Sequence, residues 1–513
     1  MKKKLGCILL CAALAFASGC APRDTGADGG PTPSASPAPS DGGTLVVSMH
    51  EPDTYNPLLT QSVSCAQAYG LIYDTLFVAD EAQGLSPNLC ESYTISGGQT
   101  FVLTLSQSAA WHDGEAFSAR DVVYTFDYIR SHETPYTHLL AEVASVSETA
   151  SGGVEIVLTR PNSGFLSTLT FPIIKDEDDV LVGTGPFSVS SVTQMKKITL
   201  SANKAYHRGA PHFDGAEILF INDAQTAMSA FSANQISALA GSAIDFSAFS
   251  VRDYMKRAAY PTNQYEFLAF NHNKLLFQNE VIRRAISMAI NRQEIAQNAL
   301  VHTVVPANAP IHPQSYLYDS SLDVTEGSAK NARDLLATNG FSDTDADGVL
   351  EKEQIVITFE ILINNDDSQR QKEAELIAKS LKEAGMNARV ASVAREEYYR
   401  RIESGDFDVY ISGVDILNTL DLEFLLGSGG AKNFTGFQSE VLDMRLSSMA
   451  RAQSAEEQAI EAQKFIRYFN QAYPICGIGF TQGELFYHQS VAGVCVNSSN
   501  IYENVFQWFF LKE

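Results

Sequence analysis

The sequence predicts an α/β protein with mixed β-sheets. Short runs rich in Val, Ile and Phe alternate along the chain with longer segments of helical periodicity, and this alternation is typical of α/β folds. Hydrophobic residues make up 45% of the 513 residues and aromatic residues 10%, which is enough for sizeable cores. The composition changes to that of a folded protein at Thr44. The part of the 513-residue chain that follows is long enough for two or three lobes.

The first residues predict export from the cell. Three lysines precede an apolar run, 5–16, that is too short to span a membrane, and small residues then lead to Cys20. We therefore assign residues 1–19 to a signal peptide. The small residues before Cys20 resemble the lipobox of bacterial lipoproteins, which implies a lipid on Cys20 and a place on the outer face of the cell membrane. The alternative is an ordinary signal peptide, because Ala17 stands where the lipobox prefers Leu.

Residues 20–43 predict a flexible linker behind this anchor. They are almost all Pro, Gly, Ser, Ala and Asp, and such a composition cannot form a core. We expect a disordered, lipid-anchored linker here. No later apolar run reaches the length of about 18 residues that a membrane-spanning helix needs.

The charge of the chain is strongly acidic. The 60 Asp and Glu outnumber the 36 Lys and Arg, and removal of residues 1–19 takes away three lysines and leaves a net charge of −27. A surface of this kind repels nucleic acids and anionic lipids, so we expect no nucleic-acid partner. We interpret the acidity as a contribution to solubility and expect a monomer.

The elements of the first half follow from local patterns. Residues 44–49 are β-branched and apolar, 99–106 alternate between apolar and polar side chains, and 155–158 and 198–200 form further apolar runs; the sequence therefore predicts four strands. The apolar segment 69–78 predicts a helix. Ser118 begins another helix, because Asp121 can complete a capping box with it.

The second half continues the alternation. Apolar residues at helical spacing predict helices over 279–299, 329–339, 368–384 and 455–473. The glycines Gly340 and Gly385 end the second and third of these. Apolar runs between the helices predict strands over 355–362, 390–393 and 407–411.

Several short motifs follow one another in a fixed order. They are YDTL (73–76), SPNLCESY (86–93), WHDGE (111–115), FSARDVV (117–123), GTGPF (183–187), LAFN (268–271), VIRRAI (281–286) and AINR (289–292). Together they resemble the motifs of the dipeptide/oligopeptide-binding family (family 5) of extracytoplasmic solute-binding proteins, which serve ABC importers. We expect the His112-Asp-Gly turn and the glycines of GTGPF to be framework residues, with the glycines at a sharp chain reversal.

This resemblance implies a periplasmic-binding-protein-like fold, in which two jaws close on a ligand, with an extra third domain. Lobe I would comprise 44–70, 183–262 and 485–513. Lobe II, the extra domain, would comprise 71–182, and lobe III would comprise 263–484.

The resemblance also implies ligand-binding residues in lobe III. In peptide binders of the family, an Asp in the segment G-W-x-x-D-Y-x-D-P pairs with the α-ammonium of the ligand. Here that segment begins at Gly413 and lacks the Trp and the Pro; Asp415 is the first counterpart of the Asp, and Asp421 is the second. Asn271 would lie near the strand that crosses between the lobes. These departures leave the ligand class open.

Two further sets of residues suggest sites of another kind. Asp343, Asp345 and Asp347, with Gly348, match the start of a calcium loop, but Gln354 stands where the loop needs Glu, so a polar turn is the preferred interpretation and we expect no metal. Four cysteines remain in the folded part: Cys65, Cys90, Cys476 and Cys495. The last two flank a possible hairpin and are the better candidates for a disulfide, with buried thiols as the alternative.

Taken together, these features predict a lipid-anchored solute receptor of an ABC importer that binds peptides and partners membrane permease subunits. No nucleophile motif occurs, so we expect neither an enzyme nor a cofactor. Three alternatives stay open: the same fold with a nickel chelate, haem or an oligosaccharide as ligand; a signalling-peptide receptor without transport; and, remotely, a lipid-anchored hydrolase.

Overall fold

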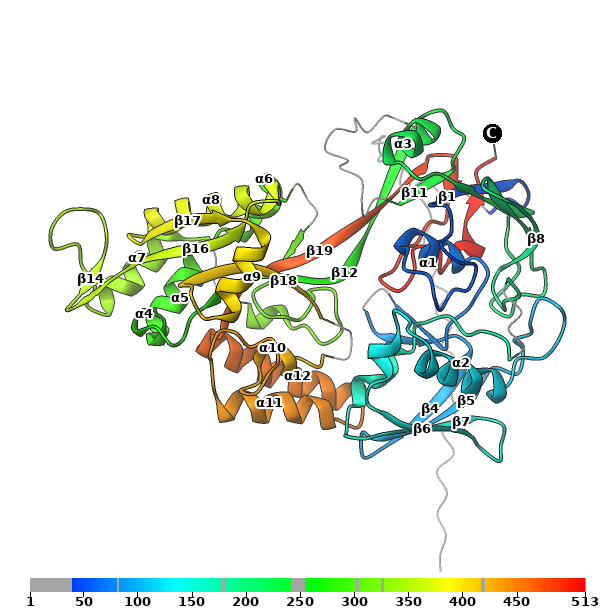
Figure 1. Cartoon of the computed structure of the whole chain (residues 1–513), viewed down its shortest axis with the longest axis horizontal. Coiled ribbons are helices and arrows are strands. Elements are labelled where there is room, and N and C mark those ends of the chain that lie inside the picture. Colours follow the sequence, from blue (N-terminus) through cyan, green and yellow to red (C-terminus); the bar gives the residue numbers. More distant parts are fainter. Residues whose placement is uncertain are drawn as a thin grey trace, which may run out of the picture. The chain divides into compact units, whose positions relative to one another are not determined.

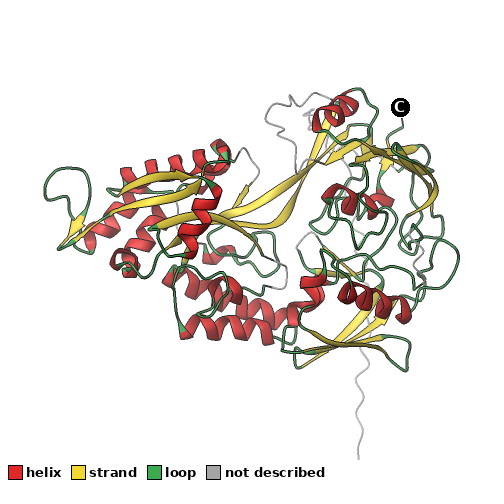
Figure 2. Cartoon of the chain, viewed as in Figure 1, coloured by secondary structure: helices red, strands yellow, loops and turns green. Residues whose placement is uncertain are grey.

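The computed structural model describes residues 39–80, 83–176, 181–240, 254–300, 304–323, 327–416 and 420–512. These residues form an α/β structure with three main sheets (Figures 1 and 2). The predicted signal peptide, Cys20 and the linker up to residue 38 lie outside the described residues. Within the described ranges, no helix has both the length and the apolar character needed to cross a membrane.

The first sheet has four strands in the order β1-β10-β9-β8. β1 pairs parallel with β10, and the other two pairs are antiparallel. Leu45, Val47 and Met49 of β1 are buried, as the predicted strand over 44–49 requires. The strands are β1 (Thr44–Met49), β8 (Phe187–Thr193), β9 (Lys197–Ala202) and β10 (Gly215–Phe220).

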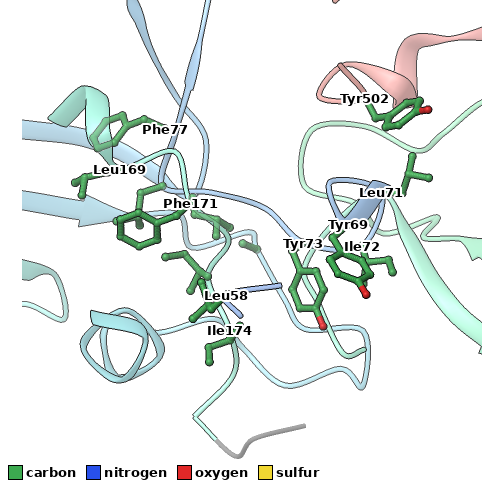
Figure 3. Close-up of a cluster of buried hydrophobic side chains, with 14 of the residues drawn as sticks. Leu58, Tyr69, Leu71, Ile72, Tyr73, Phe77, Leu169, Phe171, Ile174 and Tyr502 are labelled. Carbon is green, nitrogen blue, oxygen red and sulfur yellow. The ribbon is translucent and has the colours of Figure 1, made fainter. Parts of the chain in front are cut away.

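The second sheet is antiparallel, with the order β4-β5-β7-β6. Its strands are β4 (Cys90–Ser96), β5 (Thr100–Leu105), β6 (Val143–Glu148) and β7 (Val154–Leu158). Helix α2 (Ala119–Ser131) begins after Ser118, whose backbone N–H donates to Asp121 at 2.8 Å, as the predicted capping box requires. One hydrophobic cluster joins the side chains of the first two sheets; Figure 3 shows part of it, around Leu58, Phe171 and Tyr502.

The third sheet is the largest and contains two long strands. Its order is β11-β19-β12-β18-β16-β17, and β13 also pairs with β19. The strands are β11 (Ala238–Ala240), β12 (Met255–Phe270), β13 (Val304–Pro306), β16 (Thr358–Asn364), β17 (Asn387–Val393), β18 (Val409–Asp415) and β19 (Ile475–His488). The antiparallel pair β12–β19 extends from β11 to the strands β16–β18 (Figure 1), and its register shifts between Pro261 and Tyr265.

Helices cover both faces of this large sheet. They are α5 (Glu280–Ala289), α6 (Arg292–Asn298), α7 (Ala329–Thr338), α8 (Ser368–Glu383), α9 (Arg395–Glu403), α11 (Glu440–Arg451) and α12 (Ala455–Ala472). Successive residues of β12 face opposite sides: Leu268 and Phe270 pack with α5, α7 and α8, whereas Phe267 and Ala269 pack in the cluster that contains α11 and α12. The sheet is therefore buried on both faces.

Shorter elements complete the described chain. The helices are α1 (Val63–Tyr69), α3 (Ala224–Ser232), α4 (Leu275–Gln278) and α10 (Glu423–Leu426). The two-stranded ribbons pair β2 (Phe77–Ala79) with β3 (Leu85–Pro87), β14 (Glu351–Lys352) with β15 (Ile355–Val356), and β20 (Val491–Ala492) with β21 (Phe509–Phe510).

Two predicted helices differ from the structure. The segment 69–78 is not a helix: α1 ends at Tyr69, and the apolar run that follows is a buried loop leading into β2. A short apolar run does not distinguish these alternatives, because burial in a loop demands the same residues. The segment 279–299 is two helices, α5 and α6, because the side chain of Asn291 accepts from the N–H of Glu294 and begins a new helix.

Candidate functional site

Three adjoining cavities form the candidate site. The first, which we call the polar pocket, has a volume of about 270 Å³ and is lined by Ala66, Gln67, Gly70, Tyr73, Thr75, Tyr136, Leu139, Ser167, Thr168, Thr170, Pro172, Asn263, Ser498, Ser499, Asn500 and Glu503. The second is a small cavity at His312, and the third, of about 280 Å³, lies at Tyr93. Asn263 of β12 borders the first two, and Ser167 borders the first and third, so the cavities are neighbours.

Two segments far apart in the sequence fix one wall of the polar pocket. Gly70 caps the end of helix α1, and a Cβ at this position would lie 2.3 Å from Asn500 Nδ2, so this close approach requires glycine. Asn500 Nδ2 donates to the carbonyl of Gln67 at 2.9 Å, and the N–H of Ile501 donates to Gln67 Oε1 at 2.8 Å. These bonds hold the wall in place without a ligand.

The lining of the polar pocket carries one carboxylate. Amides, hydroxyls and two tyrosines supply its other polar groups, and the described lining contains neither Lys nor Arg. Oε1 of Glu503 accepts from Nη1 of Arg208, while the Glu503 side chain stays 10% exposed. Burial raises the pKa of Glu503 to about 7; the charge of Arg208 opposes this rise and that of Asp74 adds to it.

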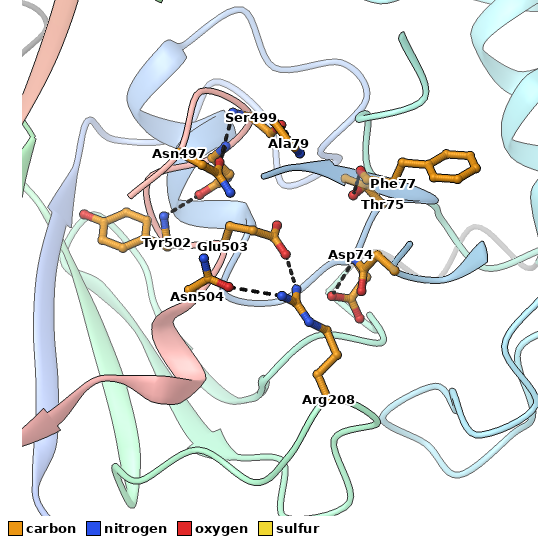
Figure 4. Close-up of polar contacts among 12 residues, drawn as sticks. Asp74, Thr75, Phe77, Ala79, Arg208, Asn497, Ser499, Tyr502, Glu503 and Asn504 are labelled. Carbon is orange, nitrogen blue, oxygen red and sulfur yellow. Dashed lines mark hydrogen bonds and ion pairs between the residues drawn. The ribbon is translucent and has the colours of Figure 1, made fainter. Parts of the chain in front are cut away.

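Asp74 lies in the same region as Glu503 and Arg208 (Figure 4) and is the centre of a buried network. The carboxylate of Asp74 accepts from the hydroxyl of Tyr206 at 2.8 Å and from that of Thr184 at 3.0 Å, and it lies 3.2 Å from His207 Nε2. Burial acts to raise the pKa of Asp74, but the bond and charge of His207, with the two hydroxyls, outweigh it and hold the pKa below its usual range. Asp74 is therefore a buried anion close to Glu503.

Most of the sequence motifs build this framework. Asp74 belongs to YDTL and Thr184 to GTGPF, and a Cβ on Gly183 would lie 1.9 Å from the carbonyl oxygen of Ile72. The glycine is needed for contact between these two segments, which is a different reason from the chain reversal that the sequence suggested. In the His112-Asp-Gly turn, Gly114 has a φ of +93° and the N–H of Glu115 donates to Asp113, as predicted.

His312 lines the small cavity, and one nitrogen of its ring has no partner among the described residues. The ring is 4% exposed, and its Nδ1 accepts from the N–H of Gln314 at 3.1 Å. The proton of the neutral ring is then on Nε2, which has no partner among the described residues. Burial lowers the pKa of His312 to about 4, so the imidazole is neutral at pH 7 and keeps one N–H available for a hydrogen bond.

The residues predicted from the resemblance lie in or next to strands β12 and β18 of the large sheet. Asn271 is buried, and its Nδ2 donates to the carbonyls of Phe407 at 2.9 Å and Gly405 at 3.1 Å. Asp415 is exposed at the end of β18, where it pairs with Gln264 of β12. None of the four predicted residues lines the three cavities, and residues 417–419 between the two aspartates lie outside the described chain.

Gly413 is held against a buried ion pair. A Cβ at this position would lie 2.3 Å from Glu266 Oε1. The other carboxylate oxygen of Glu266, Oε2, accepts a hydrogen bond from Arg370 Nη2 at 3.0 Å. Glu373 of α8 is buried close by, and its Oε1 has no partner in the described structure. Two carboxyl groups thus share the charge of one guanidinium beside β18.

Asp421 takes part in an ion-pair cluster. Its Oδ2 accepts a hydrogen bond from Arg160 Nη2 at 2.8 Å, and Arg160 Nη1 donates to Glu423 at 3.0 Å. Arg160 also bonds to Glu142. The cluster ties the segment after β18 to the second sheet.

The acidic loop 343–347 is a turn closed by its own bonds. Carboxylate oxygens of Asp343, Asp345 and Glu351 lie within 4.8 Å of one another. Three backbone N–H groups of the loop donate to its aspartates. The N–H of Gly348 donates to Asp343, that of Asp347 to Asp345, and that of Val349 to Asp347. These bonds are those of a polar turn, and the absence of a calcium site stays a prediction.

The predicted hairpin between Cys476 and Cys495 is wrong. Residues Ile475–His488 form the single long strand β19, which spans roughly 45 Å at about 3.3 Å per residue and carries the chain away from Cys476. The Sγ of Cys476 lies 3.2 Å from Nη2 of Arg292 inside the large sheet. Cys65 and Cys90 are buried free thiols.

Comparison with known families gives a match to most of the chain. Residues 84–435 match the profile of "Bacterial extracellular solute-binding proteins, family 5 Middle". The oligopeptide-binding protein AppA of Bacillus subtilis is 22% identical over 507 residues, covering 92% of this chain and 93% of AppA.

Solved structures share the fold. The murein tripeptide-binding protein MppA, in its unliganded open form, has a TM-score of 0.79 and 17% identity, covering 93% of this chain and 98% of its own. NikZ of Campylobacter jejuni, solved with Ni(L-His), has a TM-score of 0.63 and 21% identity, covering 91% of this chain and 99% of its own. These neighbours confirm the predicted fold class.

Glu503, Arg208 and His312 were absent from the sequence-based site. No motif surrounds Glu503, and its partner Arg208 is 295 positions away in the sequence. The one available signal was an acidic residue within an otherwise aromatic and amide-rich C-terminal segment, 497–510.

Proposed function

Because the chain belongs to the bacterial extracellular solute-binding proteins of family 5, which are substrate-binding proteins of ABC transporters, we propose that it captures peptides and delivers them to membrane permease subunits. The observation that carries this proposal is the full-length similarity to AppA, a protein named for oligopeptide binding. Since the members of this family are solute-binding proteins, we infer that the protein binds its ligand without catalysing a reaction.

The chemistry of the cavities is consistent with a peptide ligand. Amide and hydroxyl groups of the polar pocket can both donate and accept, which suits the alternating N–H and C=O groups of a peptide backbone. The His312 N–H adds a donor in the neighbouring cavity. Tyr73, Tyr136 and Tyr93 supply ring surface for side chains.

A metal chelate is the second candidate ligand. A relative of this fold was solved with Ni(L-His). His312 lines the small cavity, and its Nε2 is buried and has no partner among the described residues. In the tautomer that carries its proton on Nδ1, which gives up the bond from Gln314, Nε2 could ligate a metal. We rank a peptide above a metal chelate because AppA, which is similar over nearly its full length, is named for oligopeptide binding.

We also propose that the mature protein is exported and held at the outer face of the cell membrane by a lipid on Cys20. The support is the sequence pattern of residues 1–43, which provides an apolar export segment, a cysteine after small residues and a linker without core residues. The family is extracellular, and this agrees with export.

Native mass spectrometry of the purified protein tests the ligand class. A peptide ligand adds masses that peptide fragmentation can sequence, whereas a nickel chelate adds a mass with the nickel isotope pattern. Calorimetry with tri-alanine and longer alanine peptides then gives affinities. If only non-peptide masses co-purify and no peptide binds, the peptide proposal is wrong.

A further inference from the structure

The polar pocket holds two polar groups with unused hydrogen-bonding capacity. The hydroxyl of Ser498 is buried and makes no hydrogen bond to any described residue. Glu503 bonds through Oε1 to Arg208, the one described side chain that reaches this carboxylate, and it keeps part of its surface in the cavity. Buried polar groups are nearly always paired, so both groups have capacity for a ligand or ordered water.

The charges around Glu503 favour a cation. Two carboxylates, Asp74 and Glu503, lie in this region. Asp74 lies 3.2 Å from Nε2 of His207. Arg208 donates both to Glu503 and to Asn504, which accepts from its Nη2 at 3.1 Å. Among the described residues that line the pocket there is no Lys or Arg to supply a second positive charge. Burial of a carboxylate is costly, and a ligand ammonium bonded to the second oxygen of Glu503 would add to the pairing that Arg208 provides at Oε1.

We propose that Glu503 receives an amine of the ligand in the polar pocket, with the Ser498 hydroxyl as a neighbouring hydrogen-bond partner. For a peptide, which rests on the function proposed above, this group is the α-ammonium. Glu503 then takes the role that the family motif suggested for Asp415. The structure favours Glu503 because it is buried in a cavity, whereas Asp415 is exposed and lines none of the three cavities.

Matched ligand pairs test this assignment by calorimetry. The probes are tri-alanine with N-acetyl-tri-alanine, and cadaverine with 1,5-pentanediol. We expect the wild type to bind each amine at least about 30-fold more tightly than its uncharged counterpart, which is the lower end of the effect of removing one partner of a buried charge pair. Glu503→Gln should lose this preference, and Asp415→Asn should keep it. Glu217→Gln, which removes a carboxylate paired with Lys197 in the first sheet, is the matched control and should bind as the wild type does.

The pH profile gives a readout that a structural role of Glu503 would not produce. Since Glu503 titrates near pH 7, the wild type should bind cadaverine about fivefold more tightly at pH 7 than at pH 6, while Glu503→Gln should show no such change. If Glu503→Gln fails to fold, two other measurements test the assignment: the pH profile of the wild type and amine binding by Ser498→Ala, which we expect to be weaker. A wild-type affinity for cadaverine that is equal at pH 6 and pH 7 would contradict the assignment.

The outcomes separate the two proposals. If tri-alanine binds but acetylation or Glu503→Gln has no effect, the Glu503 assignment is wrong and the peptide proposal stands. If Asp415→Asn abolishes the amine preference, Asp415 is the anchor and Glu503 is not. If cadaverine binds through Glu503 and no peptide binds, the amine pocket stands and the peptide proposal fails.

Discussion

Glu373 provides a stability prediction whose magnitude follows from the structure. This residue is 1% exposed, lies in α8 and shares Arg370 with Glu266. Burial first, and then the charge of Glu266, raise the pKa of Glu373 from 4.5 to about 8, against the charge of Arg370. At pH 7 the folded protein therefore holds a proton on Glu373 that the unfolded chain has released.

The sign of the pH dependence follows from this difference. The folded state binds the proton more tightly, so the contribution of Glu373 to stability is full below pH 4.5 and is lost as the pH rises toward 8. With about 1.4 kcal/mol per pKa unit, the loss amounts to about 3 kcal/mol at pH 7. Glu373→Gln cannot ionise, and it should therefore raise the free energy of unfolding by up to about 3 kcal/mol at pH 7 and leave it nearly unchanged at pH 4.5.

Urea unfolding of the wild type and of Glu373→Gln at several pH values between 4.5 and 8 measures this effect. Glu375→Gln is the matched control, because Glu375 lies in the same helix but is exposed, and it should shift the curves little at any pH. If the difference between Glu373→Gln and the wild type does not grow with pH, the buried carboxyl is not protonated in the folded protein and the reasoning fails.

Three further predictions concern the anchor, the packing of β18 and the acidic loop. Cys20→Ser should release the protein into the medium or leave its signal peptide uncut, and a variant that fractionates with membranes and is processed like the wild type would contradict the lipid anchor. Gly413→Ala should lower the free energy of unfolding by about 1 to 3 kcal/mol, because its Cβ would overlap Glu266, whereas Gly429→Ala has free space and should have little effect; equal urea midpoints would refute the packing argument. Calcium added to chelator-treated protein should leave Tm unchanged, and a rise of several degrees would show that loop 343–347 binds the ion.

The sequence predicted the fold better than the site. The strand over 44–49 and the helix after Ser118 depend on local patterns of burial and capping, and the structure contains both. The helix over 69–78 was wrong because a buried loop and a buried helix have the same apolar composition. Glu503 could not be found because its burial and its partner Arg208 arise from contacts between distant segments.

The resemblance-based residues show a related limit. Gly413 belongs to a family motif, yet its close contact is with Glu266, a packing constraint that no pattern within the motif reveals. Gly183 likewise is required by the carbonyl of Ile72 on another segment. These motif glycines mark positions of close packing, against a side chain at Gly413 and against a backbone carbonyl at Gly183, and such packing belongs to the fold and not to the ligand.

The irregular pairing of β12 and β19 has a mechanical consequence. Between Pro261 and Tyr265 the ladder of backbone bonds is interrupted, and an interrupted pair of strands resists bending less than a continuous one. Asn263 lies in this interruption and also borders the polar pocket and the His312 cavity, while its carbonyl receives the N–H of Ile416 at 2.8 Å. One of the two irregular points of this strand pair is therefore also a wall of the cavities, so a molecule bound there would contact the interrupted part of the ladder directly.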